Sequence, residues 1–371
     1  MSGSAPLAGI KVIALEQAVS APYASRQLAD IGAEVIKIER PEGDFARDYD
    51  HYVAGTSSFF VWANRSKSSV VLDLKNETDR ARLESMLEDA DVFIVNLAPA
   101  AAQRLGLSAA QVGERYPRIV ACEITGYGAG GPRSDDKAYD LAIQAEAGAM
   151  SVTGDKDVSK VGFSAADIAA GSFAFSGILA ALVRRGRTGE GAVLSVSMLD
   201  ALAEWLSAPL LAAHYGPGQP KRTGRRHASI APYGTFELSD GTTILIAIQN
   251  DREFHAFADL VLGDVLIAED ERFQSAAARI AHVDSLEALI AQAFTDIKAE
   301  EIRRRLALAK IAVANVNSLD EVWAHPQLRA RHRFVDVEAP EGSVEVLKFP
   351  VEFQDFEPRY GRVPKLGEAT S

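Results

Sequence analysis

Short apolar runs separated by amphipathic segments fill the first half of the chain. Ile10–Leu15 is a nearly continuous apolar run, typical of a buried parallel strand, and Ala21–Gly32 follows it with helical spacing. The same pattern predicts a helix at Asn76–Asp89 and further strands at Ala33–Ile38, Ser69–Leu74, Val92–Val95, Ile119–Ile124 and Ala192–Val196. This repeated order of strand and helix predicts an α/β fold with an open, Rossmann-like parallel sheet.

The turn after the first predicted strand reads EQAVSAPYAS. It lacks the G-x-G-x-x-G sequence that lets a backbone approach a pyrophosphate closely. A nicotinamide-dependent dehydrogenase is therefore disfavoured.

A long apolar segment, Phe163–Gly186, lies at the centre of the chain. Its second half, Gly171–Arg185, predicts a helix that is apolar on nearly every side and therefore buried. Asp167 stands just ahead of this helix. Its carboxylate could cap the helix, or it could be a catalytic group kept ionised by the same N–H groups. The local sequence leaves both interpretations open, and caps are the commoner of the two.

The second half of the chain changes character after a helix predicted at Met198–His214. The runs Tyr233–Leu238 and Thr243–Ile248 flank a Ser-Asp-Gly turn and predict a hairpin, with helices and one strand, Ile311–Val316, after it. The tail, Phe334–Phe356, has a strand-like pattern. We therefore predict a large domain of residues 1–215 and 325–371, a small α+β domain of residues 225–320, and linkers at 216–224 and 321–324.

Composition narrows the class of protein. The chain has 371 residues, of which 47% are hydrophobic, and a formal net charge of −12. This negative charge argues against a nucleic-acid or membrane-surface partner. The one cysteine, Cys122, excludes an internal disulfide framework and indicates a reducing compartment. The N-terminus does not read as a signal peptide and no long apolar run reads as a membrane span, so we expect a cytoplasmic protein.

Several cations follow predicted strands despite the acidic composition. They are Arg40, Arg65, Lys67, Lys75, Arg104 and Lys137. Any one of them, taken alone, is explained better by a solvated surface. Ligands of open α/β sheets gather at the carboxyl ends of strands, however, where Arg and Lys bind phosphates. The repeated placement therefore indicates an anionic ligand with several phosphates.

Six ordered segments carry a resemblance to a known family. They read LAGIKVIALEQAVSAPYAS, LADIGAEVIKIERPEGD, NRSKSSVVLDLK, VFIVNLAPAAAQRLGL, ITGYGAGGPRSDDKAYDLAIQAEAG and FSAADIAAGSFAFSGILAALVRRGRTGEGAVLSVSMLDA. Over residues 7–368 the chain resembles the class III CoA-transferases, the family of formyl-CoA transferase, carnitine CoA-transferase and α-methylacyl-CoA racemase.

This resemblance implies a catalytic aspartate at Asp167, a coenzyme A thioester as substrate and no permanently bound cofactor. It also implies an interlocked homodimer in which each chain threads through the other. The residues that match the family's CoA contacts are Val19, Arg40, Leu72, Asp73, Leu74, Lys75, Asn96, Leu97, Ala98, Arg104, Asp136, Lys137, Ala138 and Tyr139.

Two departures from the family pattern bear on the reaction. The racemase branch has a His-Asp pair where this chain has Tyr139 and Asp140. Tyrosine is a poor base at neutral pH, so transfer is favoured over an acyl-CoA racemase or epimerase, with a non-catalytic CoA-binding protein as a third alternative. The segment Gly218–Tyr233 lacks the glycine tetrad of the formyl-CoA branch, which argues against formyl or oxalate specificity.

A carboxylate nucleophile predicts a definite chemistry. Ionised Asp167 would attack the donor thioester, forming a mixed anhydride and then an aspartyl-CoA thioester. We expect a low pKa for Asp167 and oxyanion donors among the N–H groups of residues 169–171. Cations that would hold a second carboxylate of the acceptor, if they are not simply surface charges, are Arg47, Arg225, Arg226 and His227.

Overall fold

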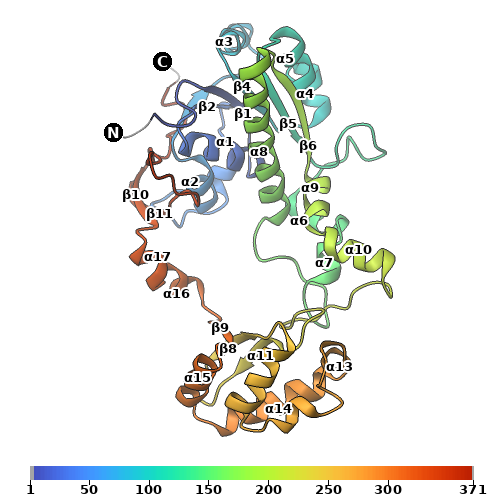
Figure 1. Ribbon diagram of the computed structural model, residues 1–371. Coiled ribbons are helices and arrows are strands. Elements are labelled where there is room, and N and C mark those ends of the chain that lie inside the picture. Colours follow the sequence, from blue (N-terminus) through green and yellow to red (C-terminus); the bar gives the residue numbers. More distant parts are fainter. Residues whose placement is uncertain (1–3, 370–371) are drawn as a thin grey trace. The chain divides into compact units, whose positions relative to one another are not determined.

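The computed structural model describes residues 4–369, which form two compact units (Figure 1). The larger contains residues up to 150, 160–210 and those from 326 onward, and the smaller contains 151–159 and 211–325. The predicted linker 216–224 thus groups with the smaller unit. The N–H of Gly224 donates to the Gly154 carbonyl at 2.9 Å, and Arg222 donates to the carbonyls of Asp155 and Lys156. These are backbone contacts, which no pattern of apolar side chains could reveal.

The larger unit is built on a six-stranded parallel sheet, which confirms the predicted open sheet. Its order is β3-β2-β1-β4-β5-β6. The strands are β1 (Lys11–Leu15), β2 (Glu34–Glu39), β3 (Lys67–Val71), β4 (Val92–Val95), β5 (Val120–Thr125) and β6 (Ala192–Ser197). This is the doubly wound order, and the direction of winding reverses between β1 and β4. Ligands of such sheets bind at the carboxyl ends of the strands at this point.

Helices cover both faces of this sheet, as a buried parallel sheet requires. One core joins β1, β4 and β5 to α1 (Ser20–Asp30), α8 (Ala165–Thr188) and α9 (Met198–Trp205). The other core joins the opposite side chains of the same strands to α3 (Glu77–Glu88), α4 (Pro99–Leu105) and α5 (Ala109–Arg115). The remaining short helices up to β7 are η1 (Phe45–Asp48), α2 (Ser58–Asn64), α6 (Asp140–Glu146), α7 (Ala149–Val152) and α10 (Ser207–Tyr215).

Helix α8 differs from the sequence expectation in two ways. It begins at Ala165, so Asp167 lies inside its first turn rather than ahead of it. Its alanines are buried against α1 and the sheet, but Phe173 and Val183 are exposed, so the expected burial on nearly every side is wrong for this chain. By length and composition alone α8 is apolar enough to cross a membrane, which the sequence analysis did not anticipate. Its packing in the first core identifies it as a core helix of the larger unit.

The smaller unit confirms the predicted hairpin and the strand after it. Strands β7 (Tyr233–Glu237), β8 (Thr243–Ala247) and β9 (Ala312–Asn315) form an antiparallel sheet. The helices are α11 (Asp251–Ala256), η2 (Phe257–Leu262), α12 (Leu266–Glu269), α13 (Ala276–Ala281), α14 (Val283–Asp296), α15 (Ala299–Leu308) and α16 (Leu319–Trp323). Phenylalanines of β7, η2 and α14 pack together in its core.

The C-terminal segment returns to the larger unit. It contains α17 (Pro326–Ala330) and the hairpin of β10 (Phe334–Ala339) and β11 (Gly342–Leu347). The strand-like pattern that continues to Phe356 does not form strand after Leu347. Phe349 and Phe353 instead pack their rings onto the core of the larger unit from an irregular backbone.

Candidate active site

The turn between β1 and α1 lies at the point where the winding of the sheet reverses. The side-chain amide of Asn96, the first residue after β4, accepts from the Gln17 N–H at 2.9 Å and donates to the Gln17 carbonyl at 2.8 Å. The next residue, Ala18, has a left-handed backbone with φ of 63°, and its N–H donates to Asp44 at 3.1 Å. Side chains from two other strand ends therefore fix the backbone of this turn.

Asp167 faces the end of this turn from α8. The Ser20 hydroxyl and the Ser20 backbone N–H lie close enough to the Asp167 carboxylate to lower its pKa. The helix cap is supplied by Asp140, which accepts from the N–H groups of Ala166 at 2.8 Å and Asp167 at 3.3 Å. Gln144 holds the second oxygen of Asp140 at 2.7 Å. The interpretation of Asp167 as the cap is therefore wrong, because the N–H groups at the start of α8 donate to Asp140 and not to the Asp167 carboxylate.

Burial sets the charge state of Asp167. Burial raises the pKa of its carboxyl to about 7, the neighbouring Asp140 charge raises it further, and the hydrogen bonds from Ser20 oppose the rise. The expected low pKa is thus wrong, because the N–H groups at the start of α8 serve Asp140 instead. Residues 169–171 lie a full turn inside α8, where each N–H bonds to the carbonyl four residues earlier, so they are not free oxyanion donors.

This raised pKa predicts the pH dependence of any reaction in which Asp167 must be ionised. The rate should rise about tenfold per pH unit below pH 7 and level off above it. Asp140→Asn removes a neighbouring negative charge but keeps an oxygen to accept from Ala166, so it should move the midpoint to lower pH. Single-turnover rates across the range from about pH 5.5 to about pH 9 measure both. A midpoint that Asp140→Asn leaves unmoved would contradict the coupling.

A cavity of about 230 Å³ opens beside this turn at the carboxyl ends of β1 to β4. Six of the residues expected to contact CoA line it: Arg40, Leu72, Asp73, Leu74, Lys75 and Leu97. Leu72–Leu74 lie just beyond β3, because the strand begins and ends earlier than its apolar pattern predicted. Arg40 and Lys75 are exposed at the rim of the cavity, so two cations border a largely apolar site.

The other residues expected to contact CoA lie outside this cavity lining. Val19 is buried before α1, Ala98 precedes α4, and Arg104 is exposed in the last turn of α4. Asn96 binds the Gln17 backbone, as described above. Asp136, Lys137, Ala138 and Tyr139 form the loop before α6, where Asp136 accepts from Arg133 at 2.7 Å. Contact of these residues with CoA stays a prediction.

Two of the cations singled out by position have a structural role instead. Lys67 is fully buried and donates to Glu16 at 2.6 Å, and burial lowers the pKa of its ammonium to about 7. Arg65 donates twice to the buried carboxylate of Asp30. Both interpretations as ligand cations are wrong, because Lys67 is the first residue of β3 and Arg65 lies two residues before that strand rather than after one.

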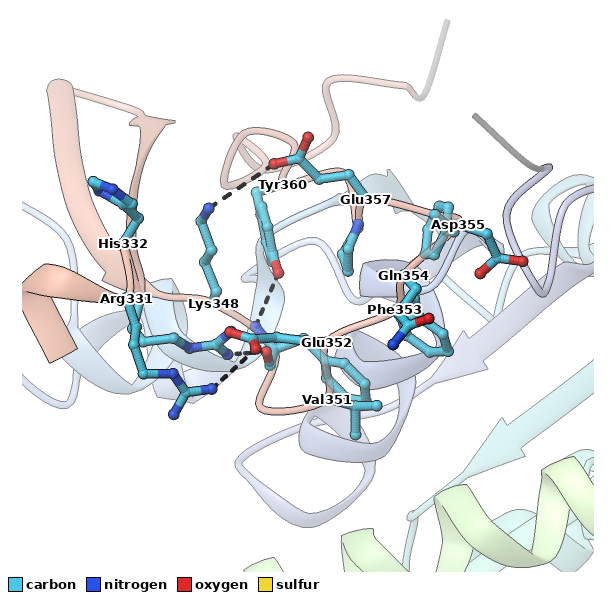
Figure 2. Close-up of a pocket in the computed structure, with 14 residues that line it drawn as sticks. Arg331, His332, Lys348, Val351, Glu352, Phe353, Gln354, Asp355, Glu357 and Tyr360 are labelled. Carbon is cyan, nitrogen blue, oxygen red and sulfur yellow. Dashed lines mark hydrogen bonds and ion pairs between the residues drawn. The ribbon is translucent and has the colours of Figure 1, made fainter. Parts of the chain in front are cut away.

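A second, larger cavity of about 560 Å³ lies in the C-terminal segment. Figure 2 shows Arg331 directed at Glu352 and Lys348 directed at Glu357. Arg333 also pairs with Glu352. Because these cations are already paired with carboxylates, the cavity offers a weaker anion site than the one beside the turn between β1 and α1. Among residues 4–369, no group of three or more His, Cys, Asp or Glu is placed to hold a metal ion.

Comparison with known proteins agrees with this geometry. The model of CoA-transferase family III matches residues 7–370. A succinate–glutarate CoA-transferase from Agrobacterium fabrum is 34% identical, over 98% of this chain and 93% of the relative. An acetyl-CoA:oxalate CoA-transferase from Acetobacter aceti has the same identity and coverage. The crystal structure of a CAIB/BAIF family protein from Brucella suis matches with a TM-score of 0.87 and 32% identity, covering 99% of this chain and 98% of that one.

Proposed function

This chain belongs to CoA-transferase family III, and we propose that it moves CoA from an acyl-CoA donor such as succinyl-CoA to a dicarboxylic acid, with Asp167 as the nucleophile. The observation that carries the proposal is the position of Asp167. Its half-buried carboxylate does not cap α8 and lies beside Ser20, at the point where the winding of the sheet reverses. The relatives named for glutarate and oxalate support a dicarboxylate acceptor.

The reaction divides into two exchanges at Asp167. Its ionised carboxylate attacks the thioester carbonyl, the C–S bond breaks, and a mixed anhydride and CoA thiolate form. The thiolate then attacks the aspartyl carbonyl, which releases the donor acid and leaves an aspartyl-CoA thioester. The acceptor carboxylate attacks this thioester and the same steps run in reverse. Ser20 lies where its hydroxyl and N–H can hold the aspartyl oxygens throughout.

Two features favour transfer over racemisation. Racemisation needs a pair of bases on either side of the α-carbon, and the second candidate base here is Asp140. Both oxygens of Asp140 are engaged, one by the first N–H groups of α8 and the other by Gln144. Tyr139 is exposed and is a poor base at neutral pH. Exchange of solvent deuterium at the α-carbon without acyl transfer would identify the racemase instead.

Two of the cations proposed to hold the acceptor are already engaged. Arg47 donates to both oxygens of Glu39, and Arg226 pairs with Asp284 and Glu287. Arg225 is exposed, and no hydrogen bond or ion pair of its side chain is found within residues 4–369. Binding of a second acceptor carboxylate by Arg225 or His227 stays a prediction from the sequence.

The decisive experiment combines a substrate panel with trapping. Incubation with one acyl-CoA at a time, followed by hydroxylamine and intact-mass analysis, should give a hydroxamate at Asp167. The acceptor panel contains succinate, glutarate and oxalate, since the missing glycine tetrad argues against oxalate while one relative is named for it. Thioester donors that leave Asp167 unmodified throughout would contradict the proposal.

We also propose that the protein is an interlocked homodimer. No residue of α10 is buried, and Leu210, Leu211 and Tyr215 are exposed on it. Leu319 of α16 is 88% exposed. Several large apolar side chains exposed close together on one helix favour burial against another protein chain. Two differently tagged preparations, mixed under native conditions, should each run as dimers and fail to exchange subunits until they are unfolded together. Rapid exchange would show that the chains are not threaded.

A further inference from the structure

The left-handed turn at Ala18 stores strain close to the nucleophile. For an L-residue other than glycine this backbone conformation is strained, and it persists only where the surroundings hold it. Ala18 is followed by Val19 and then by Ser20, whose hydroxyl and N–H lie beside the Asp167 carboxylate. Whatever holds Ala18 therefore also determines where the first turn of α1 meets Asp167.

The buried carboxylate of Asp44 is what holds it. One oxygen accepts from the N–H groups of Ala18 at 3.1 Å and Ala46 at 2.9 Å. The other accepts from the fully buried ammonium of Lys37 at 2.8 Å. Lys37 also donates to the Glu16 carbonyl at 3.3 Å. Asp44 is thus held by Lys37 of β2 and by the N–H of Ala46 two residues later in the chain, and Asp44 in turn holds the Ala18 N–H.

The far end of the turn is pressed against α8. A Cβ added at Gly171 would lie 2.6 Å from the Ser20 carbonyl oxygen, so glycine is what allows the two helices to approach this closely. Gly171 and Asp167 are four residues apart and share one face of α8. The position of Ser20 against Asp167 is therefore determined by two contacts, one on α8 and one through Ala18.

We propose that Asp44 is a positioning residue of the transfer reaction, holding Ala18 in the left-handed conformation so that Ser20 stays in register with Asp167. This inference rests on the proposed role of Asp167 as nucleophile. Asp44 also lines the cavity of about 230 Å³, but its connection to Asp167 described above runs only through the backbone from Ala18 to Ser20. It acts through three residues of backbone, and its removal should slow chemistry more than it weakens CoA binding.

The test compares Asp44→Asn with two companions. Asp44→Asn leaves one acceptor oxygen for two sets of donors, and the Lys37 ammonium should take it, so the amide NH2 would face the Ala18 N–H. Formation of the Asp167 adduct should then slow about 100-fold, while the Kd for free CoA changes less than about threefold. Adding Ala18→Gly should restore at least about tenfold, because glycine adopts positive φ without strain. A structural role alone would not give this rescue. Asp30→Asn, another buried carboxylate paired with arginines, is the matched control and should lose stability but keep the adduct rate.

Ala18→Val keeps the proposal testable if Asp44→Asn does not fold. It leaves the buried charges in place but adds a β-branched residue at positive φ, so it should slow adduct formation about as much as Asp44→Asn does. Wild-type adduct rates in both Asp44→Asn and Ala18→Val would overturn the inference. A wild-type protein that forms no adduct with any donor would overturn the proposed function itself, which is a different result.

Discussion

Asp167→Asn should lower CoA transfer by about four orders of magnitude or more, because an amide cannot form the mixed anhydride. The aspartyl adduct should disappear at the same time. Rapid mixing with an acyl-CoA and intact-mass detection measures both. Asp200→Asn is the matched control, since Asp200 is likewise the third residue of its helix but is exposed, and it should keep full activity.

The same substitution should stabilise the folded protein at alkaline pH. The pKa of Asp167 is raised from 3.8 to about 7 in the folded state. A carboxyl whose pKa is raised by folding contributes stability below its unfolded pKa and loses that contribution as pH rises through the folded value. The free energy of unfolding of the wild type should therefore fall by up to about 4 kcal/mol between pH 4 and pH 8. The Asp167→Asn variant should not show this fall, because the asparagine side chain stays neutral. Urea unfolding of both proteins at these two pH values measures this effect. A difference in free energy of unfolding between the two proteins that is the same at both pH values would contradict the raised pKa.

The sheet was predictable because its signal is local. A buried parallel strand needs a short apolar run, and the range Val92–Val95 matches β4 at both ends. The short helices α2, α4 and α6 were missed because seven residues carry too little periodicity. The single helix expected at Met198–His214 is two, α9 and α10, because its apolar spacing continues across Leu206, where the helix breaks.

The candidate site was only partly predictable. The resemblance to a known family placed Asp167, and the cations after strands pointed to the rim of the cavity through Arg40 and Lys75. Ser20, Asp44 and Asp140 were missed as partners of the nucleophile and its turn. Each acts through contacts between elements distant in sequence, as in the 26-residue separation of Asp140 from Ala166. A sequence pattern records which residues are buried, but it does not record which buried carboxylate meets which N–H.

Gly171→Ala should damage both activity and stability although alanine is the better helix former. The new Cβ would lie 2.6 Å from the Ser20 carbonyl oxygen and 2.9 Å from Cδ1 of Tyr23, and the first of these is backbone that cannot rotate away. Overpacking of this kind costs about 1–3 kcal/mol, which exceeds the gain of about 1 kcal/mol in helix propensity. The first turn of α1 must then move away from Asp167, and the adduct rate should fall about 100-fold.

Gly177→Ala is the matched control on the same helix. Its Cβ would meet only Cδ1 of Leu194, at an ordinary 3.6 Å, so the gain in helix propensity should survive. This variant should be more stable than the wild type by up to about 1 kcal/mol and keep the wild-type adduct rate. Thermal unfolding and single-turnover trapping of the two variants side by side decide the matter. Equal stability and equal rates would show that α1 and α8 do not need their close approach at Gly171, and that Ser20 is held against Asp167 by the turn alone.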